Sequence, residues 1–122
     1  MNVDSHINYV ELPARDLEQV KRFYSQAFGW TFEDFGAEYI AFHGAGLDGG
    51  FFKADLAVSA KSGSALVVLY ADDLAATLER VKTFGATIAQ EVFDFPGGQR
   101  FHFLDPVGNE LAVWSPPVDS AS

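Results

Sequence analysis

Apolar residues along the chain alternate between a period of two and a period of three to four, in the same order twice. Residues 7–12 are rich in strand formers and end at Pro13, which predicts a short strand. Asp16 then opens a helix that Gly29 ends as a left-handed cap; its apolar stripe consists of Leu17, Val20, Phe23, Tyr24, Ala27 and Phe28. Period two returns in three predicted strands, over residues 30–33, 38–42 and 50–53.

The second half repeats this order after a polar link at residues 60–64. The pattern predicts a strand over residues 66–70, a helix over residues 73–84 with Gly85 as its cap, and strands near residues 87–93, 99–104 and 110–114. A duplicated unit is the simplest explanation. One strand–helix–three-strand unit is too small to bury its own sheet, so the two units must pack together within the chain or across a dimer.

Length and composition favour one domain over residues 1–122, with module one at about 6–56, module two at about 64–116 and a disordered tail at 117–122. The 122 residues are 48% hydrophobic, which suffices for one core. No apolar run reaches the roughly 18 residues that a membrane span needs, and the start of the chain lacks the pattern of a signal peptide. We therefore expect a cytoplasmic protein.

Charge and cysteine content exclude several functions. Eight Lys and Arg against 17 Asp and Glu give a net charge of −9, which argues against nucleic acid and anionic membranes as partners. The absence of cysteine excludes disulfides, thiolate metal sites and a cysteine nucleophile. A small molecule that is neutral or cationic remains as a partner.

Two motifs at the expected separation carry a family resemblance. The first is the segment VELPARDL at residues 10–17, followed by Phe23-Tyr24 and by residues 28–30; the second is DPVGNE at residues 105–110, leading to Trp114. Together with the duplicated pattern, they resemble the vicinal oxygen chelate superfamily of glyoxalase I, bleomycin-resistance proteins and extradiol dioxygenases. The resemblance implies an α+β fold in which two tandem βαβββ modules form a half-barrel sheet with a cavity, with the helices on the outer face.

The resemblance also locates the four side chains that hold a divalent metal in metal-binding relatives. Here these positions carry Tyr9, Leu66, Ala112 and, within one residue, Phe51. None offers the imidazole or carboxylate that such ions need, so we expect no metal and no other cofactor.

The three histidines do not rebuild such a site. Alternation turns His6 away from the face of Tyr9, His43 ends a strand at a Gly-rich turn, and His102 lies between two phenylalanines. We interpret them as partly exposed strand residues, and metal-dependent chemistry is therefore not transferred from the relatives.

Strand alternation predicts the lining of the cavity that remains. It places Glu11 beside Tyr9, Tyr70 beside Leu66, and both Glu110 and Trp114 beside Ala112. The predicted ligand-binding residues are Tyr9, Glu11, Phe51, Leu66, Tyr70, Glu110, Ala112 and Trp114. This aromatic and acidic lining suits a flat organic molecule, and carboxylates beside rings favour a cation.

Other interpretations of these residues stay open. Tyr9 and Trp114 equally fit ordinary core packing, and Glu110 equally fits a solvated start of a strand. Glu11 interrupts an apolar strand, so it either has a buried partner or faces the cavity. If the protein is an enzyme, Glu11 is the best candidate base, because desolvation among Tyr9, Phe51 and Trp114 would raise its pKa.

The leading hypothesis is a protein like the glyoxalase and bleomycin-resistance families that binds a small molecule without metal. It would either sequester its ligand or perform a metal-independent lyase or isomerase reaction. The alternatives are a metal-dependent glyoxalase-type lyase or dioxygenase with an atypical site, and a regulatory binding domain. We also expect a homodimer, because open sheet edges and an apolar face need cover.

Overall fold

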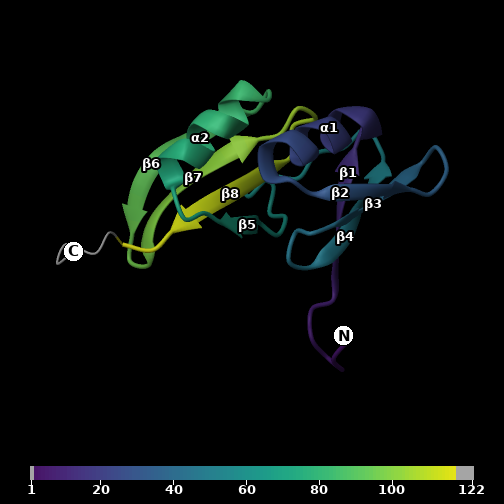
Figure 1. Ribbon diagram of the computed structural model, residues 1–122, viewed down its shortest axis with the longest axis horizontal. Coiled ribbons are helices and arrows are strands. Elements are labelled where there is room, and N and C mark those ends of the chain that lie inside the picture. Colours follow the sequence, from purple (N-terminus) through teal and green to yellow (C-terminus); the bar gives the residue numbers. More distant parts are fainter. Residues whose placement is uncertain (1, 118–122) are drawn as a thin grey trace.

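The computed structural model describes residues 2–117 and shows the expected α+β order of two βαβββ modules (Figure 1). The tail predicted for residues 117–122 lies, apart from Pro117, outside the described residues. Module one consists of β1 (Tyr9–Ala14), α1 (Leu17–Phe28), β2 (Thr31–Asp34), β3 (Tyr39–His43) and β4 (Asp48–Lys53). Module two consists of β5 (Val67–Tyr70), α2 (Leu74–Thr83), β6 (Thr87–Phe95), β7 (Gly98–Leu104) and β8 (Glu110–Ser115).

Each module forms its own four-stranded mixed sheet, with strand orders β1-β4-β3-β2 and β5-β8-β7-β6. The first strand of each module pairs in parallel with the last, and the other pairs are antiparallel. The edges formed by β1 and β5 face each other without joining the two sheets, so the half-barrel is not closed. Among the described residues, no helix is long and apolar enough to cross a membrane.

The helix boundaries follow from the capping residues that the sequence indicated. The Asp16 side chain accepts a hydrogen bond from the Gln19 amide at 3.1 Å, and Gly29 ends α1 with a φ of 74°. Asp73 caps α2 in the same way. The end of α2 differs slightly, because Phe84 takes the cap position and Gly85 follows it with a positive φ.

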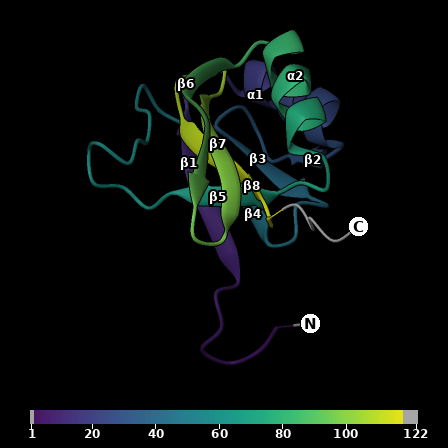
Figure 2. The same cartoon turned by 90° about the vertical axis from the view of Figure 1, so that its left-hand side faces the viewer.

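Both helices cover the same side of the sheets and lie beside each other (Figures 1 and 2). Arg80 of α2 donates a hydrogen bond to the Ala27 carbonyl at the end of α1. Beneath them lies an aromatic core whose fully buried rings include Phe23, Tyr24, Phe51, Phe101 and Phe103. We call the opposite side of the two sheets the open face, because no helix covers it.

The loop at residues 105–109 joins the two modules. Asp105 is only 3% exposed and accepts hydrogen bonds from the Tyr24 hydroxyl at 2.9 Å and from two backbone amides of its own loop. Burial raises the pKa of Asp105, although these hydrogen bonds counteract part of the rise. Asn109 donates to the Pro13 carbonyl at 2.7 Å and accepts from the Val58 amide. The segment that carries the second sequence motif therefore also holds the modules together.

Candidate ligand-binding site on the open face

In module one, Tyr9 and Glu11 of β1 lie on the open face and are exposed, Tyr9 by 44%. The Tyr39 side chain extends from β3 over the neighbouring strand β4, and its hydroxyl shares a hydrogen bond with the Tyr9 hydroxyl on β1. Gly50 makes this crossing possible, because a Cβ atom there would lie 2.1 Å from the Tyr39 hydroxyl. Burial raises the pKa of Tyr39, and its contacts with Tyr9 and Glu11 raise it further. Glu11 thus stands beside two phenols at the surface, so the desolvation expected for it is absent.

The prediction that Phe51 lines the cavity is wrong. Phe51 is fully buried on the helix side, with its ring centre 5.4 Å from that of Tyr24 and 5.7 Å from that of Phe42. It pairs with Leu12, which also faces the core, whereas Gly50 pairs with Glu11. The expected position was in error by one residue, and one residue along a strand reverses the face.

In module two, an aromatic groove lies on the open face. It has a volume of about 310 Å³ and is lined by Val68, Phe95, Gly97, Arg100 and Trp114. The Trp114 ring meets the rings of Tyr70, at 5.6 Å between centres, and of Phe95, at 6.4 Å. Trp114 is only partly buried. It therefore belongs to a surface groove and not to the core between sheets and helices.

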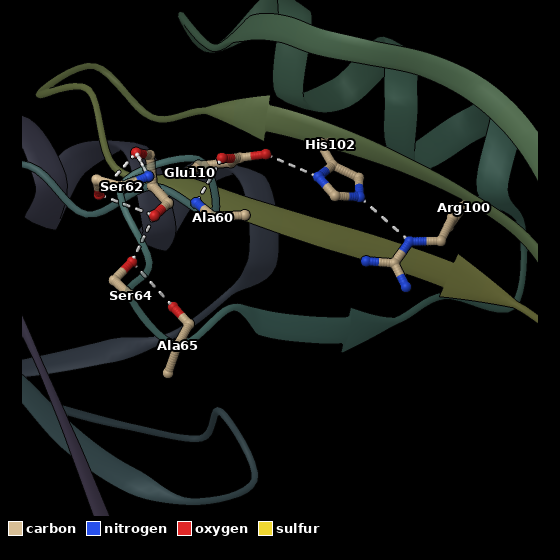
Figure 3. Close-up of polar contacts among 8 residues, drawn as sticks. Ala60, Ser62, Ser64, Ala65, Arg100, His102 and Glu110 are labelled. Atoms are coloured by element: carbon tan, nitrogen blue, oxygen red, sulfur yellow. Dashed lines mark hydrogen bonds and ion pairs between the residues drawn. The ribbon is translucent and has the colours of Figure 1, made fainter.

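Glu110 is neither solvated nor free to face a ligand, which corrects both sequence interpretations. It is 8% exposed, and its carboxylate contacts His102 Nδ1 at 2.8 Å and accepts a hydrogen bond from the Ala60 amide at 2.9 Å (Figure 3). The hydrogen bond from His102 is the main cause that lowers the pKa of Glu110, and the Ala60 amide adds to it. Ala112 is also fully buried, so it cannot touch a ligand in this conformation.

His102 connects Glu110 to Arg100. The histidine is 5% exposed, not partly exposed as expected, and its Nε2 accepts a hydrogen bond from Arg100 Nε at 3.2 Å. Nδ1 must then carry the ring proton and donate it to Glu110, so the imidazole is neutral. Sequence reasoning missed Arg100. The available signal was the spacing: Arg100 lies two residues before His102, so both side chains are on the same face of one strand. The neighbouring strand carries Phe93 and Phe95.

An apolar cavity of about 410 Å³ occupies the seam between β1 and β5. Its lining includes Tyr9, Leu12, Trp30, Leu66 and Val68, so two of the predicted binding residues meet here. Val68 lines both this cavity and the aromatic groove, which makes the two spaces neighbours. We call the cavity and the groove together the candidate site.

A separate hollow of about 380 Å³ lies at the start of α1. Its lining includes Arg15, Asp34 and Lys53, which carry charges of both signs. None of the residues that the sequence predicted for ligand binding lines it.

The side chains at the family's metal positions do not fit a divalent metal. Tyr9, Leu66 and Ala112 together offer one phenol oxygen, and Phe51 points into the core. Within residues 2–117, no three His, Asp or Glu side chains gather closely enough to bind an ion. Both ring nitrogens of His102 already have protein partners, so it has no lone pair to offer.

Comparisons with known proteins agree with this architecture. Solved structures that resemble the chain include a glyoxalase-related enzyme from Fulvimarina pelagi, with 24% identity, a TM-score of 0.75, and 93% of this chain and 90% of that one covered. A lactoylglutathione lyase from Agrobacterium tumefaciens matches with 19% identity, a TM-score of 0.68, and 93% and 96% coverage. A family enzyme from Burkholderia phytofirmans PsJN matches with 16% identity, a TM-score of 0.71, and 89% and 97% coverage. No curated protein matches the chain.

Two βαβββ modules with helices on one side and an open face on the other define a glyoxalase-like protein. The family model named Glyoxalase/Bleomycin resistance protein/Dioxygenase superfamily matches residues 6–113. The chain therefore belongs to this superfamily, as the two sequence motifs implied.

Proposed function

We propose that this protein binds a small, flat and largely apolar organic molecule at the candidate site, without a metal of the family type. The observation that carries the proposal is that Val68 lines two neighbouring spaces: an apolar cavity of about 410 Å³ and an aromatic groove of about 310 Å³. Small-molecule sites are typically concave, apolar and equipped with a few polar groups, and here Tyr9 and Arg100 supply such groups at the two ends.

The aromatic side chains support a flat ligand. The Trp114 ring is inclined by 72° to the Tyr70 ring and by 73° to the Phe95 ring, so neither of these rings is stacked parallel to the indole. Such aromatic contacts contribute about 0.5 to 1.5 kcal/mol beyond the burial of area. A planar aromatic molecule placed against Trp114 and Val68 would bury the apolar surface of both side chains.

If the ligand is also a substrate, we propose Glu11 as the base on its position alone: it lines neither space itself, but it lies on β1 on the same face as Tyr9, which lines the seam cavity. Its carboxylate lies at the surface of the open face, beside the Tyr9 and Tyr39 hydroxyls. When a substrate is known, Glu11→Gln should lower kcat at least about a hundredfold, in line with the usual contribution of a general base. An unchanged kcat would contradict this role and assign the proton transfer to another group.

A thermal-shift screen with flat aromatic compounds tests the binding proposal. A ligand at 100 times its Kd adds about 2.7 kcal/mol to the free energy of unfolding, which is easily detected for a chain of this length. We expect hits whose shift is lost in Trp114→Ala and kept in Phe35→Ala. Phe35 is a matched control because it is 56% exposed and lines neither space. Hits that are insensitive to Trp114→Ala would contradict the proposed location.

Elemental analysis of the purified protein tests the metal-free part of the proposal. We expect less than stoichiometric metal after dialysis, because the family's ligand positions hold Tyr9, Leu66, Ala112 and Phe51. Stoichiometric nickel, zinc, manganese or iron would contradict this part and favour the metal-dependent alternative.

A further inference from the structure

Arg100 is held in place on the open face with most of its hydrogen-bonding capacity unused. We propose that the ligand carries a planar anionic group of the carboxylate type, and that the two terminal nitrogens of Arg100 bind it. This inference rests on the proposed function, since it names the chemical class of the molecule that the candidate site would take.

In the described part of the chain, the Arg100 side chain has free hydrogen-bond donors. Its Nε–H donates to His102, but among residues 2–117 neither Nη1 nor Nη2 has a hydrogen-bond partner and no carboxylate lies within 4.0 Å of the guanidinium. Figure 3 shows the terminal nitrogens beyond the His102 contact, on the same side of the sheet as that residue. A guanidinium presents its N–H groups as a planar fork, which matches the two oxygens of a carboxylate.

His102 and Glu110 hold the Arg100 guanidinium in its orientation. Arg100 Nε contacts His102 Nε2 at 3.2 Å, and His102 Nδ1 contacts Glu110 at 2.8 Å. Because His102 and Glu110 are 5% and 8% exposed, these partners are rigid parts of the sheet and not mobile surface groups. An arginine whose side chain is already oriented loses less conformational freedom when it binds an anion.

The His102 ring lies between the positive charge of Arg100 and the nearest buried carboxylate, Glu110. The neutral imidazole of His102 separates the Glu110 carboxylate from the guanidinium, so no direct ion pair neutralises Arg100. A local positive charge therefore stands on the open face of a chain whose net charge is −9. The cation preference expected from sequence relied partly on Glu110, which is buried and paired with His102.

Aromatic rings lie beside the Arg100 guanidinium. The guanidinium carbon lies 5.5 Å from the ring centre of Phe95 and 5.8 Å from that of Phe93, and Arg100 lines the aromatic groove together with Trp114 and Val68. An anion bound at the fork would thus lie beside apolar surface. An aromatic carboxylate combines the two features that this place can recognise.

Three probes of nearly equal shape test the inference by isothermal titration calorimetry: 1-naphthoate, its neutral amide 1-naphthamide, and the cation 1-naphthylmethylammonium. We expect the wild-type protein to bind 1-naphthoate at least about tenfold more tightly than 1-naphthamide, because a charge-assisted hydrogen bond contributes about this much. Arg100→Gln should remove the difference between the two probes. Arg22→Gln is the matched control, since it removes one positive charge from an exposed position on the helix α1.

The outcomes separate the two proposals. Equal binding of 1-naphthoate and 1-naphthamide, or preferred binding of the ammonium probe, would overturn the anion inference while the proposed function stands. Loss of 1-naphthoate binding to the same degree in Arg22→Gln would also overturn it, because net charge alone would then explain the effect. Binding of none of the three probes to the wild-type protein would overturn both proposals. The comparison of probes on the wild-type protein needs no variant, so it is independent of how Arg100→Gln folds.

Discussion

Asn109 is the residue whose replacement best tests how the two modules are joined. Its side chain is fully buried; Nδ2 donates to the Pro13 carbonyl at 2.7 Å, and Oδ1 accepts from the Val58 amide at 2.9 Å. Asn109→Asp keeps the shape and the acceptor but removes the donor. At pH 8 the variant leaves the Pro13 carbonyl without its partner and places a charge in the junction.

The expected cost follows from these contacts. A buried polar group left unpaired costs about 1 to 3 kcal/mol, and a buried charge costs more, so we expect the variant to lose about 3 kcal/mol at pH 8. For a domain of this size, that loss lowers the Tm by about 12 °C. Burial raises the pKa of the introduced carboxyl in the folded state. The loss should therefore shrink as the pH falls through this raised pKa, because the protonated carboxyl can donate to Pro13 again.

Urea unfolding at pH 8 and at pH 5, followed by tryptophan fluorescence, measures both effects. Asn8→Asp is the matched control, because it adds the same charge at an exposed position whose side chain, within residues 2–117, hydrogen-bonds with Asn2 alone. An Asn109→Asp variant as stable as the control at pH 8 would refute the role of the Pro13 contact. An equal loss at both pH values would refute the explanation by a missing donor.

Three further predictions concern buried polar contacts and assembly. Tyr24→Phe removes the hydroxyl that donates to Asp105, so the free energy of unfolding should fall by about 1 to 2 kcal/mol in urea titrations; an unchanged midpoint would argue against it. The lowered pKa of Glu110 stabilises the fold above its ordinary pKa of 4.5, and this contribution disappears as the pH falls through the folded-state pKa. The stability difference between wild type and Glu110→Gln should thus shrink in acid, and a constant difference would count against the His102–Glu110 pair. Light scattering should give twice the 13.3 kDa chain mass, because the apolar residues Ile7, Leu47 and Val68 around the seam cavity are 80%, 43% and 40% exposed and need cover; a monomer at micromolar concentration would disprove the homodimer.

Local patterns were sufficient to predict the order of the strands and helices, and the family resemblance supplied their arrangement into two modules with the helices on one side. The change from period two to helical period located every strand and helix of the described residues, and Asp16, Gly29 and Asp73 marked helix ends because capping is a short-range interaction. The motif at residues 105–110 was identified through the family resemblance, but its contacts with Tyr24 and Pro13 join positions far apart in sequence. Such contacts leave no periodic signal.

The candidate site was predicted only in part, for two physical reasons. Strand β4 contains Gly49 and Gly50, which have no side chains to show which face is polar, so the face of Phe51 was misassigned. The Glu110 carboxylate is held by contacts with the Ala60 amide, fifty positions earlier, and with His102 on the paired strand. Neither contact can be predicted from the residues next to Glu110 in sequence. Tyr9 lines the cavity and Trp114 lines the groove, on the face that the sequence predicted. Strand alternation alone was enough to predict the face of these two side chains.

A two-dimensional ¹H–¹⁵N NMR titration with a thermal-shift hit tests the central claim most directly, because the protein has two tryptophan indole N–H groups. Trp114 lines the aromatic groove, whereas Trp30 is buried against the stacked ring of Tyr24 and touches only the seam cavity. We predict that the largest shifts fall on the Trp114 indole and on the amide of Val68, the residue shared by both spaces. Shifts confined to the hollow around Arg15 and Lys53, with the Trp114 and Val68 signals unmoved, would contradict binding on the open face.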